Sequence, residues 1–104
     1  MTMFEEMVNE FKEYFKGNSG VTIGEYEMSV IIKDKYLLSA FVYQEDLTYD
    51  VTVDELTLTG YDHNRYWESC ITKEEALKLF NQIRYNLAMD SANPFYVDWR
   101  KNNG

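Results

Sequence analysis

Apolar residues recur at helical spacing near each end of the chain. Between residues 3 and 16 they follow an i, i+3, i+4, i+7 pattern, and charged residues occupy the other side. Thr2 is a suitable N-cap, and Glu5 stands where it completes a capping box. A second helix is predicted to start after Thr72, with Glu75 completing the same motif, and to fade near residue 90. The pattern thus predicts one helix at the N-terminus and another toward the C-terminus.

Between the helices the pattern changes to the alternation that is typical of β-strands. Strands are predicted over residues 21–33, 36–44, 48–59 and 65–71, with turns at 34–35 and 60–64. The second strand is apolar on both faces apart from Ser39, which favours a central place in the sheet. Because every connection is short, the strands are expected to form an antiparallel meander. The predicted fold class is therefore α+β, in the order α-β-β-β-β-α: a four-stranded antiparallel meander sheet with the N-terminal and C-terminal helices packed on one face.

The third predicted strand contains an irregularity. Its apolar residues stand at odd numbers as far as residue 53 and at even numbers afterwards, so the phase shifts at Asp54 and Glu55. A β-bulge, which adds one residue to a strand, would keep Leu56 and Leu58 on the core side. The same bulge would leave Asp50 and Asp54 facing solvent.

A chain of 104 residues corresponds to a single domain, and no repeat or linker divides it. Residues 91–104 are expected to form a partly ordered C-terminal tail. Within this tail, Asn93 would cap a short helical turn that starts at Pro94, and Phe95 would pair with Trp99 at the i, i+4 spacing.

The chain is strongly acidic, with 18 Asp and Glu residues against 10 Lys and Arg residues and a net charge of −8. This charge argues against direct binding to nucleic acid or to an anionic membrane, because both require cationic patches. It is compatible with solubility alone, with an acidic docking face for a basic protein, and with cation binding.

Cysteine usage and the start of the chain indicate the compartment. Cys70 is the only cysteine, so an intramolecular disulfide is impossible, which is typical of a reducing compartment. The first residues lack the basic and continuously apolar regions of a signal peptide, and no apolar run reaches the length of a membrane span. We therefore expect a cytoplasmic protein with no membrane partner.

The residue types that carry catalysis or bind metals stand apart from one another. His63 is the only histidine and stands in a polar segment without a second base or ligand nearby. Cys70 lacks a neighbouring base and is expected to be a buried, unreactive thiol. Asp50 and Asp54 would lie about 13 Å apart on an extended strand, too far for two carboxylates that act on one bond. We therefore predict no catalytic residues, no metal and no cofactor.

The segment between Lys35 and Arg65 contains no Lys or Arg, although it is rich in carboxylates and tyrosines. This composition is closer to a protein interface than to a solvated surface, which normally mixes both signs of charge. The alternative is a solvated strand edge whose negative charge opposes aggregation. The predicted partner-binding residues are Tyr43, Glu45, Asp46, Tyr49, Asp50, Asp54, Glu55, Tyr61 and Asp62.

These observations predict a non-catalytic binding protein that docks on a basic, nucleic-acid-handling protein, such as a nuclease, and inhibits it as a DNA mimic. The analogy is with small acidic inhibitors carried by phages and mobile elements, and with immunity proteins that block nuclease toxins. It rests on size and charge, and on no motif. The alternative is a small cytosolic accessory domain, or a homodimer, whose acidity serves only solubility. A third hypothesis is a small enzyme or ligand binder that uses Tyr61, Asp62 and His63.

Overall fold

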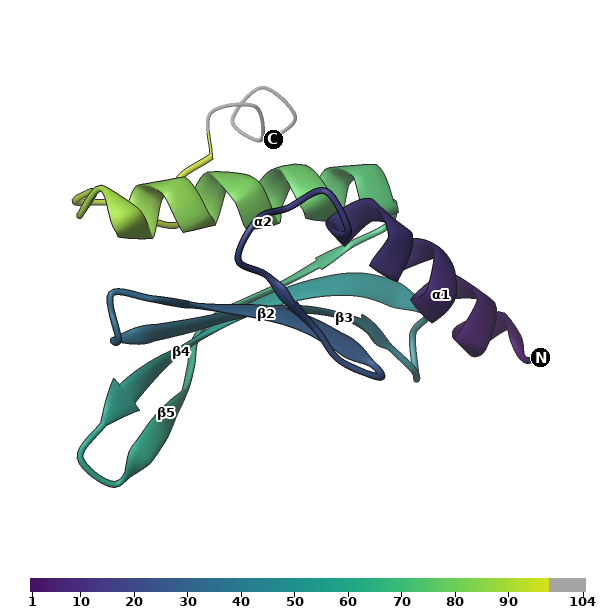
Figure 1. The fold of residues 1–104 in the computed structure, drawn as a ribbon, viewed down its shortest axis with the longest axis horizontal. Helices are drawn as coiled ribbons and strands as arrows, with labels where there is room; N and C mark the ends of the chain where they lie inside the picture. The colour runs from purple at the N-terminus through teal and green to yellow at the C-terminus, as the bar shows by residue number, and fades with distance from the viewer. Residues whose placement is uncertain (98–104) are drawn as a thin grey trace.

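Two helices cover one face of a five-stranded antiparallel sheet, and no described helix lies on the other face (Figure 1). The computed structural model describes residues 1–97, and for residues 61–64 it describes the backbone only. Neighbours in the sheet are also neighbours in sequence, so the α+β class and the antiparallel meander are confirmed. In chain order the elements are α1 (Met3–Phe15), β1 (Thr22–Ile23), β2 (Glu27–Ile32), β3 (Tyr36–Tyr43), β4 (Thr48–Thr57), β5 (Gly60–Cys70) and α2 (Lys73–Ala88).

The sheet has five strands rather than the four predicted, because the first predicted strand is in fact two strands. The chain reverses direction at residues 24–26, where the Gly24 N–H donates to the Glu27 carbonyl (2.8 Å). β1 then pairs with β2, with Thr22 opposite Ser29. A Cβ on Gly24 would approach the Glu27 carbonyl oxygen to 3.2 Å, so a glycine suits this tight reversal. Gly24 within the alternating pattern was therefore the signal of a turn.

Both helices begin at the predicted caps. The Thr2 hydroxyl accepts from the Glu5 N–H (3.1 Å), and the Glu5 carboxylate accepts from the Thr2 N–H (3.2 Å), so the capping box of α1 is complete. At α2 the Thr72 hydroxyl accepts from the Glu75 N–H (3.2 Å). These bonds satisfy amide groups that have no partner within the helix, and they fix where each helix starts.

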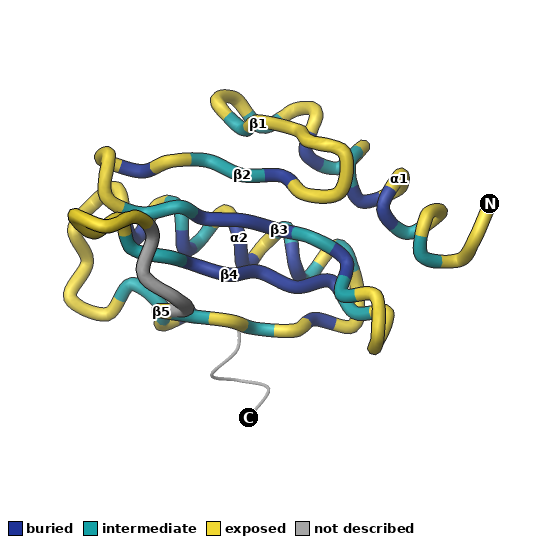
Figure 2. The backbone as a smooth tube through the Cα atoms, turned by 90° about the horizontal axis from the view of Figure 1, so that it is seen from below, coloured by how far each residue is buried: buried dark blue, intermediate teal, exposed yellow. Residues whose placement is uncertain are grey.

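The core lies between the helices and the sheet. Phe15 of α1 packs edge-to-face on Phe80 of α2, and Phe11 packs in the same way on Tyr49 of β4, with ring centroids 4.9 Å apart in both pairs. The middle parts of β3 and β4 are buried, as Figure 2 shows from the side of the sheet without helices. The central place predicted for the strand at 36–44 is confirmed by β3, which lies between β2 and β4.

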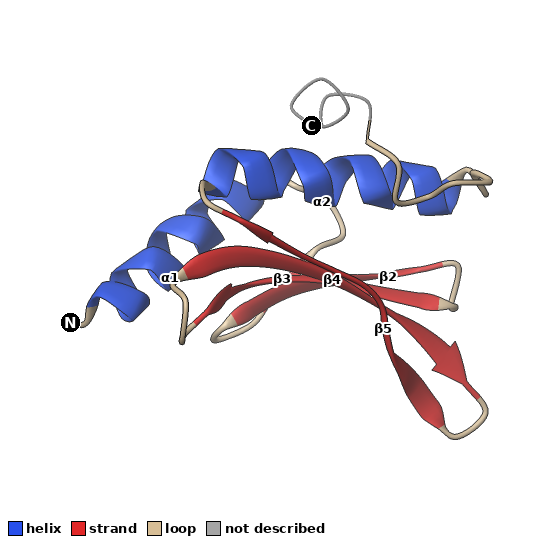
Figure 3. Ribbon diagram, turned by 180° about the vertical axis from the view of Figure 1, so that it is seen from behind, coloured by secondary structure: helices blue, strands red, loops and turns tan. Residues whose placement is uncertain are grey.

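The end of the β4–β5 hairpin projects from the sheet, away from the two helices (Figures 1 and 3). Its tip lies at residues 57–60, where Thr57 Oγ1 donates to the Gly60 carbonyl (2.7 Å). Residues 60–64 therefore belong to β5 and do not form the predicted turn. Leu56 is exposed and Leu58 is fully exposed, so the prediction that both join the core was wrong.

The sheet is irregular where the sequence predicted a bulge, but the extra residues lie in the neighbouring strand. β4 stays in register with β3 as far as Glu55, which is paired with Tyr36. Against β5, Val53 is paired with Tyr66 but Glu55 is paired with Asp62, so one residue of β4 faces three of β5. The phase of the apolar residues changes after Val53 because the strand leaves the core there.

The described part of the C-terminal tail packs against α2. Asn86 of α2 donates from its side-chain amide to the backbone carbonyls of residues 94 (2.9 Å) and 96 (3.2 Å). Where a short helical turn was predicted, residues 93–96 form a single turn, closed by a hydrogen bond from the Tyr96 N–H to the Asn93 carbonyl (3.1 Å). Phe95 stacks on Tyr66 of β5, with centroids 4.7 Å apart. Trp99, the predicted partner of Phe95, lies outside the described residues.

Candidate protein-docking surface

Strand register assigns the side chains on the face of the sheet that has no described helix. In β4, Val51 and Val53 point into the core, so Asp50, Thr52 and Asp54 point the other way. Their partners on neighbouring strands extend the same face across the sheet, and none of these residues is Lys or Arg. We call this the open face; its residues are Glu27, Ser29, Ile31, Leu37, Ser39, Phe41, Tyr43, Thr48, Asp50, Thr52, Asp54, Trp67 and Ser69.

Asp50 lies on the open face, but it is wholly buried, with 0% of its surface exposed. Its Oδ1 accepts from the Thr48 hydroxyl (2.7 Å), and its Oδ2 accepts from the Trp67 indole Nε1–H (2.6 Å). The prediction that the Asp50 side chain is exposed to solvent was therefore wrong. The reason is strand pairing, because β4 and β5 bring Trp67 next to Asp50 across 17 residues of sequence.

Trp67 forms the centre of an aromatic group on the open face. Its ring meets Phe41 at 67° and Tyr43 at 80°, with centroid distances of 6.1 and 5.8 Å. Despite these contacts, 48% of the Trp67 surface remains exposed. Tyr26, in the β1–β2 loop, is also exposed and lines a hollow together with Phe41. We call Tyr26, Phe41, Tyr43 and Trp67 the aromatic belt.

Three hollows adjoin Tyr26, and the two larger ones extend the belt around the end of the sheet. The larger, of about 500 Å³, lies between the β1–β2 loop and β3 and is lined by residues 24–27, Phe41 and Val42. Phe4 of α1 stacks on Tyr26, with centroids 6.0 Å apart. The belt therefore reaches the start of α1. The second hollow, of about 450 Å³, is lined by Thr2, Phe4, Glu5, Tyr26 and Gln44.

Exposed carboxylates border the belt at the same end of the sheet. Glu25 and Glu27 line the larger hollow, and Glu45 and Asp46 lie in the β3–β4 turn next to Tyr43. The Tyr43 hydroxyl donates to Glu45 (3.1 Å). This bond raises the pKa of Tyr43, because deprotonation would break it and place two negative charges side by side. We call Glu25, Glu27, Glu45 and Asp46 the acidic rim.

The structure brings together only part of the predicted partner-binding set. Tyr43 and the two carboxylates of the β3–β4 turn lie at the belt. Asp54 and Glu55 lie toward the other end of β4, roughly 20 Å away at about 3.3 Å per residue. Glu55 also forms an ion pair with Arg65 (3.5 Å), which neutralises its charge locally. The single acidic surface that the sequence predicted is therefore divided.

Three other predicted residues do not contribute to the described surface. Tyr49 points into the core, where it packs on Phe11 and is 8% exposed, so its side chain cannot contact a partner. Tyr61 and Asp62 lie in β5, but their side chains fall outside the described residues, as does that of His63.

Sequence reasoning missed Tyr26, Phe41 and Trp67 as members of the surface. A signal was present, because Phe41 stands two residues from Ser39 and Trp67 two residues from Ser69. Both aromatic rings are therefore in phase with the polar face of their strands, where large rings indicate a binding surface. Their contact with each other depends on the pairing of β3, β4 and β5, which a single sequence does not specify residue by residue.

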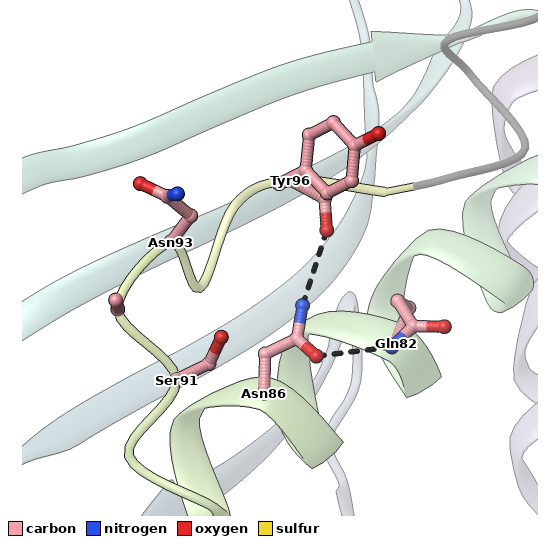
Figure 4. A pocket seen from close by; sticks show the side chains of 6 residues that line it. Gln82, Asn86, Ser91, Asn93 and Tyr96 are labelled. Carbon is pink, nitrogen blue, oxygen red and sulfur yellow. Dashed lines mark hydrogen bonds between the residues drawn. The ribbon is translucent and has the colours of Figure 1, made fainter.

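Other described features are better explained by packing. A polar hollow of about 280 Å³ lies between α2 and the tail (Figure 4). Asn86 at its centre accepts from Gln82 (3.0 Å) and donates to the tail backbone, so its polar groups hold the tail in place. Among the described residues, no group of three His, Cys, Asp or Glu residues is placed to hold a metal ion, and Cys70 is buried.

No protein-family model, no curated protein and no solved structure matches this chain. Within residues 1–97, no helix is both long enough and apolar enough to cross a membrane.

Proposed function

We propose that this protein is a non-catalytic binding domain that docks its aromatic belt and acidic rim on a cationic surface of another protein. One observation carries the proposal: partly exposed aromatic rings lie on an open face whose strand-paired residues include no Lys or Arg, and Arg65 of β5 is ion-paired with Glu55. Tyr and Trp are among the residues that dominate binding energy at protein interfaces. Acidic borders in turn select positively charged partners.

The belt supplies contact area that is already ordered. Trp67 is held by Asp50 and by its contacts with Phe41 and Tyr43. Tyr26 is held by stacking on Phe4. Side chains that are fixed before binding lose little conformational freedom when a partner docks, so more of the contact energy appears as affinity.

Within this proposal, the partner handles nucleic acid and docking inhibits it. Proteins that bind nucleic acid present the extended cationic surfaces that an acidic domain complements. A net charge of −8 on 104 residues favours rapid association by electrostatic steering. The same charge makes the complex sensitive to salt.

Affinity capture from the native host tests both parts of the proposal, which are docking through the belt and rim and a partner that handles nucleic acid. Wild type is compared with Tyr26→Ala, in the belt, and with Tyr85→Ala, a matched change at an exposed tyrosine of α2. We expect a basic partner that is retained at low salt, released at high salt, and lost with Tyr26→Ala only. Duplex DNA should compete with this domain for that partner.

Three results would contradict the proposal. A partner that binds all three forms equally, or that is retained at every salt concentration, would exclude docking through the belt and rim. If duplex DNA does not displace this domain from its partner, the domain does not dock on the partner's nucleic-acid-binding surface.

A second candidate function is a homodimerising accessory domain whose acidity serves only solubility. It is favoured by β5, an edge strand of 11 residues that has β4 as its one neighbour in the described sheet. Pairing of β5 with β5 of a second copy would extend the sheet. Sedimentation equilibrium separates the two candidates, because it measures the mass in solution and a homodimer has twice the 12.4 kDa of the monomer. A dimer that persists at all salt concentrations would favour this second candidate.

A further inference from the structure

Asp50 is a buried acidic residue, and a partner that docks on the aromatic belt would not contact it directly. Both of its carboxyl oxygens accept hydrogen bonds, one from Thr48 and one from Trp67, which is the pattern expected of a carboxylate. Both donors are uncharged groups. Within the described structure, hydrogen bonds rather than an ion pair therefore stabilise this carboxylate.

This arrangement places negative charge next to the indole of Trp67. An aromatic ring attracts cations to its face, and Trp does so most strongly of the aromatic residues. Donation of the Nε1–H to a carboxylate adds electron density to the ring, which strengthens that attraction. Phe41 and Tyr43 pack at steep angles on the indole, yet nearly half of the Trp67 residue surface is exposed. The exposed indole is therefore a prepared surface for a cation.

We propose that Trp67, held beside Asp50, is a subsite for a guanidinium group, and that an arginine side chain of the basic protein partner stacks on the indole. This inference rests on the proposed docking function and names the side chain that the surface recognises. A guanidinium group is planar and weakly hydrated, so it stacks on an aromatic ring more readily than an ammonium group does.

A carboxylate of the acidic rim lies close to this subsite. Tyr43 contacts Trp67, and the Tyr43 hydroxyl is hydrogen-bonded to Glu45. An arginine that stacks on the indole therefore has a rim carboxylate one side chain away, and this carboxylate can accept its N–H groups. Asp50 itself does not touch the ligand; it is a positioning residue that acts through Trp67.

Peptide titrations of the isotope-labelled protein, followed by NMR, test the subsite. The probes are hexa-arginine, hexa-lysine and hexa-citrulline, which keeps the shape of arginine without its charge. The Trp67 indole N–H signal, assigned with Trp67→Phe, reports contact directly. We expect hexa-arginine to bind about three- to tenfold more tightly than hexa-lysine and to shift this signal. Hexa-citrulline should bind more weakly than either peptide.

Asp50→Asn tests the positioning role, because it removes the charge and keeps the size of the side chain. The backbone amide spectrum of this variant reports whether the fold is intact. We expect the preference for hexa-arginine over hexa-lysine to fall toward one, while Tyr85→Leu on α2 leaves it unchanged. If Asp50→Asn does not fold, the wild-type comparison of the peptides together with Trp67→Phe decides the question.

The results distinguish failure of the subsite from failure of the docking function. Equal binding of the two cationic peptides, with an unmoved Trp67 signal, would overturn the subsite. If carboxylate-to-amide changes in the acidic rim still weaken both peptides, docking on a cationic surface stands without it. Partner capture that depends neither on salt nor on Tyr26 would instead overturn the docking function, whatever the peptides do.

Discussion

The hydrogen bond between Asp50 and Trp67 links the interior of the sheet to its exposed face. The bond is 2.6 Å long, and it joins the carboxylate of a residue with no exposed surface to the indole of Trp67, a residue that is 48% exposed. A buried carboxylate is destabilising without donors, so the indole N–H stabilises the fold as well as orienting the ring. The side chain that forms the centre of the belt therefore also contributes to stability.

A double-mutant cycle measures this contribution. Trp67→Phe removes the donor, Asp50→Ala removes the acceptor, and the double variant removes both. We expect a coupling energy of about 1–3 kcal/mol in the free energy of unfolding, because the bond to the carboxylate is lost only once in the double variant. Urea denaturation of the four forms gives the value. A matched cycle that combines Asp50→Ala with Tyr26→Ala should be additive, and a coupling energy near zero in the first cycle would contradict the role assigned to the bond.

Asp90 ends α2 in a left-handed conformation, with φ of 55°. The Ser91 N–H donates to the Asn86 carbonyl (2.9 Å) and the Asp90 N–H donates to the Leu87 carbonyl (3.3 Å), which is a Schellman arrangement. The Asp90 carboxylate accepts from Lys33 Nζ (2.6 Å) of the β2–β3 turn. The ion pair therefore joins the end of α2 to a turn of the sheet.

Lys33→Met should raise the pKa of Asp90. The Lys33 ammonium lowers that pKa, first through its hydrogen bond and then through its charge. Because the folded-state pKa lies below that of the unfolded chain, the stabilisation is present at neutral pH and is lost as the pH falls through the folded-state value. NMR titration of the Asp90 carboxyl carbon measures the change. Lys35→Met, which removes charge without a hydrogen bond, should give a smaller upward shift, and equal shifts would contradict this assignment.

At the scale of elements, the β4–β5 hairpin divides into a core part and a projecting arm. Val53 is fully buried, whereas Leu56 and Leu58 beyond it are exposed, and Figure 3 shows the arm leaving the two-layer body. The arm therefore contributes little buried apolar surface, although its sequence has a strand pattern. Stability should depend on the body and be nearly independent of the tip.

Leu58→Ser at the tip should change the free energy of unfolding by less than about 0.5 kcal/mol, because surface substitutions away from packed features are nearly neutral. Leu38→Ala in β3, where the side chain is fully buried, should instead cost about 2–5 kcal/mol through lost transfer energy and a cavity. Urea denaturation of both variants checks the contrast. A large loss of stability with Leu58→Ser would mean that the tip packs against the body.

The elements differ in how far the sequence specifies them. Both helix starts were predicted, because Thr2 and Thr72 cap through bonds to residues three positions away. β1 was missed because its two residues become a strand only by pairing with β2. Asp50 was assigned to the correct face with the wrong exposure, because its cover, Trp67, comes from another strand. Local signals were sufficient for the helix starts, whereas β1 and the candidate surface depend on contacts between strands.

At the scale of the whole molecule, negative charge acts over two distances. Long-range steering depends on the net charge of −8 and on nearly every carboxylate, including those of α1. Short-range docking depends only on groups that touch the partner, which in our proposal are the rim and the belt. Rate constants separate the two contributions, because steering changes the association rate and close contacts change the dissociation rate.

Two triple variants with the same charge change test this separation. Glu25→Gln, Glu27→Gln and Asp46→Asn alter the rim, whereas Glu6→Gln, Glu13→Gln and Asp34→Asn alter α1 and the β2–β3 turn; each set takes the net charge from −8 to −5. Binding to the captured partner is measured by surface plasmon resonance at several salt concentrations. We expect both sets to slow association at low salt to a similar degree, because the lost net charge is equal. Only the rim set should also speed dissociation, by about tenfold for each 1.4 kcal/mol of lost contact energy. Equal dissociation rates for the two sets would mean that the acidity of this protein acts at long range alone and that the rim is not a docking surface.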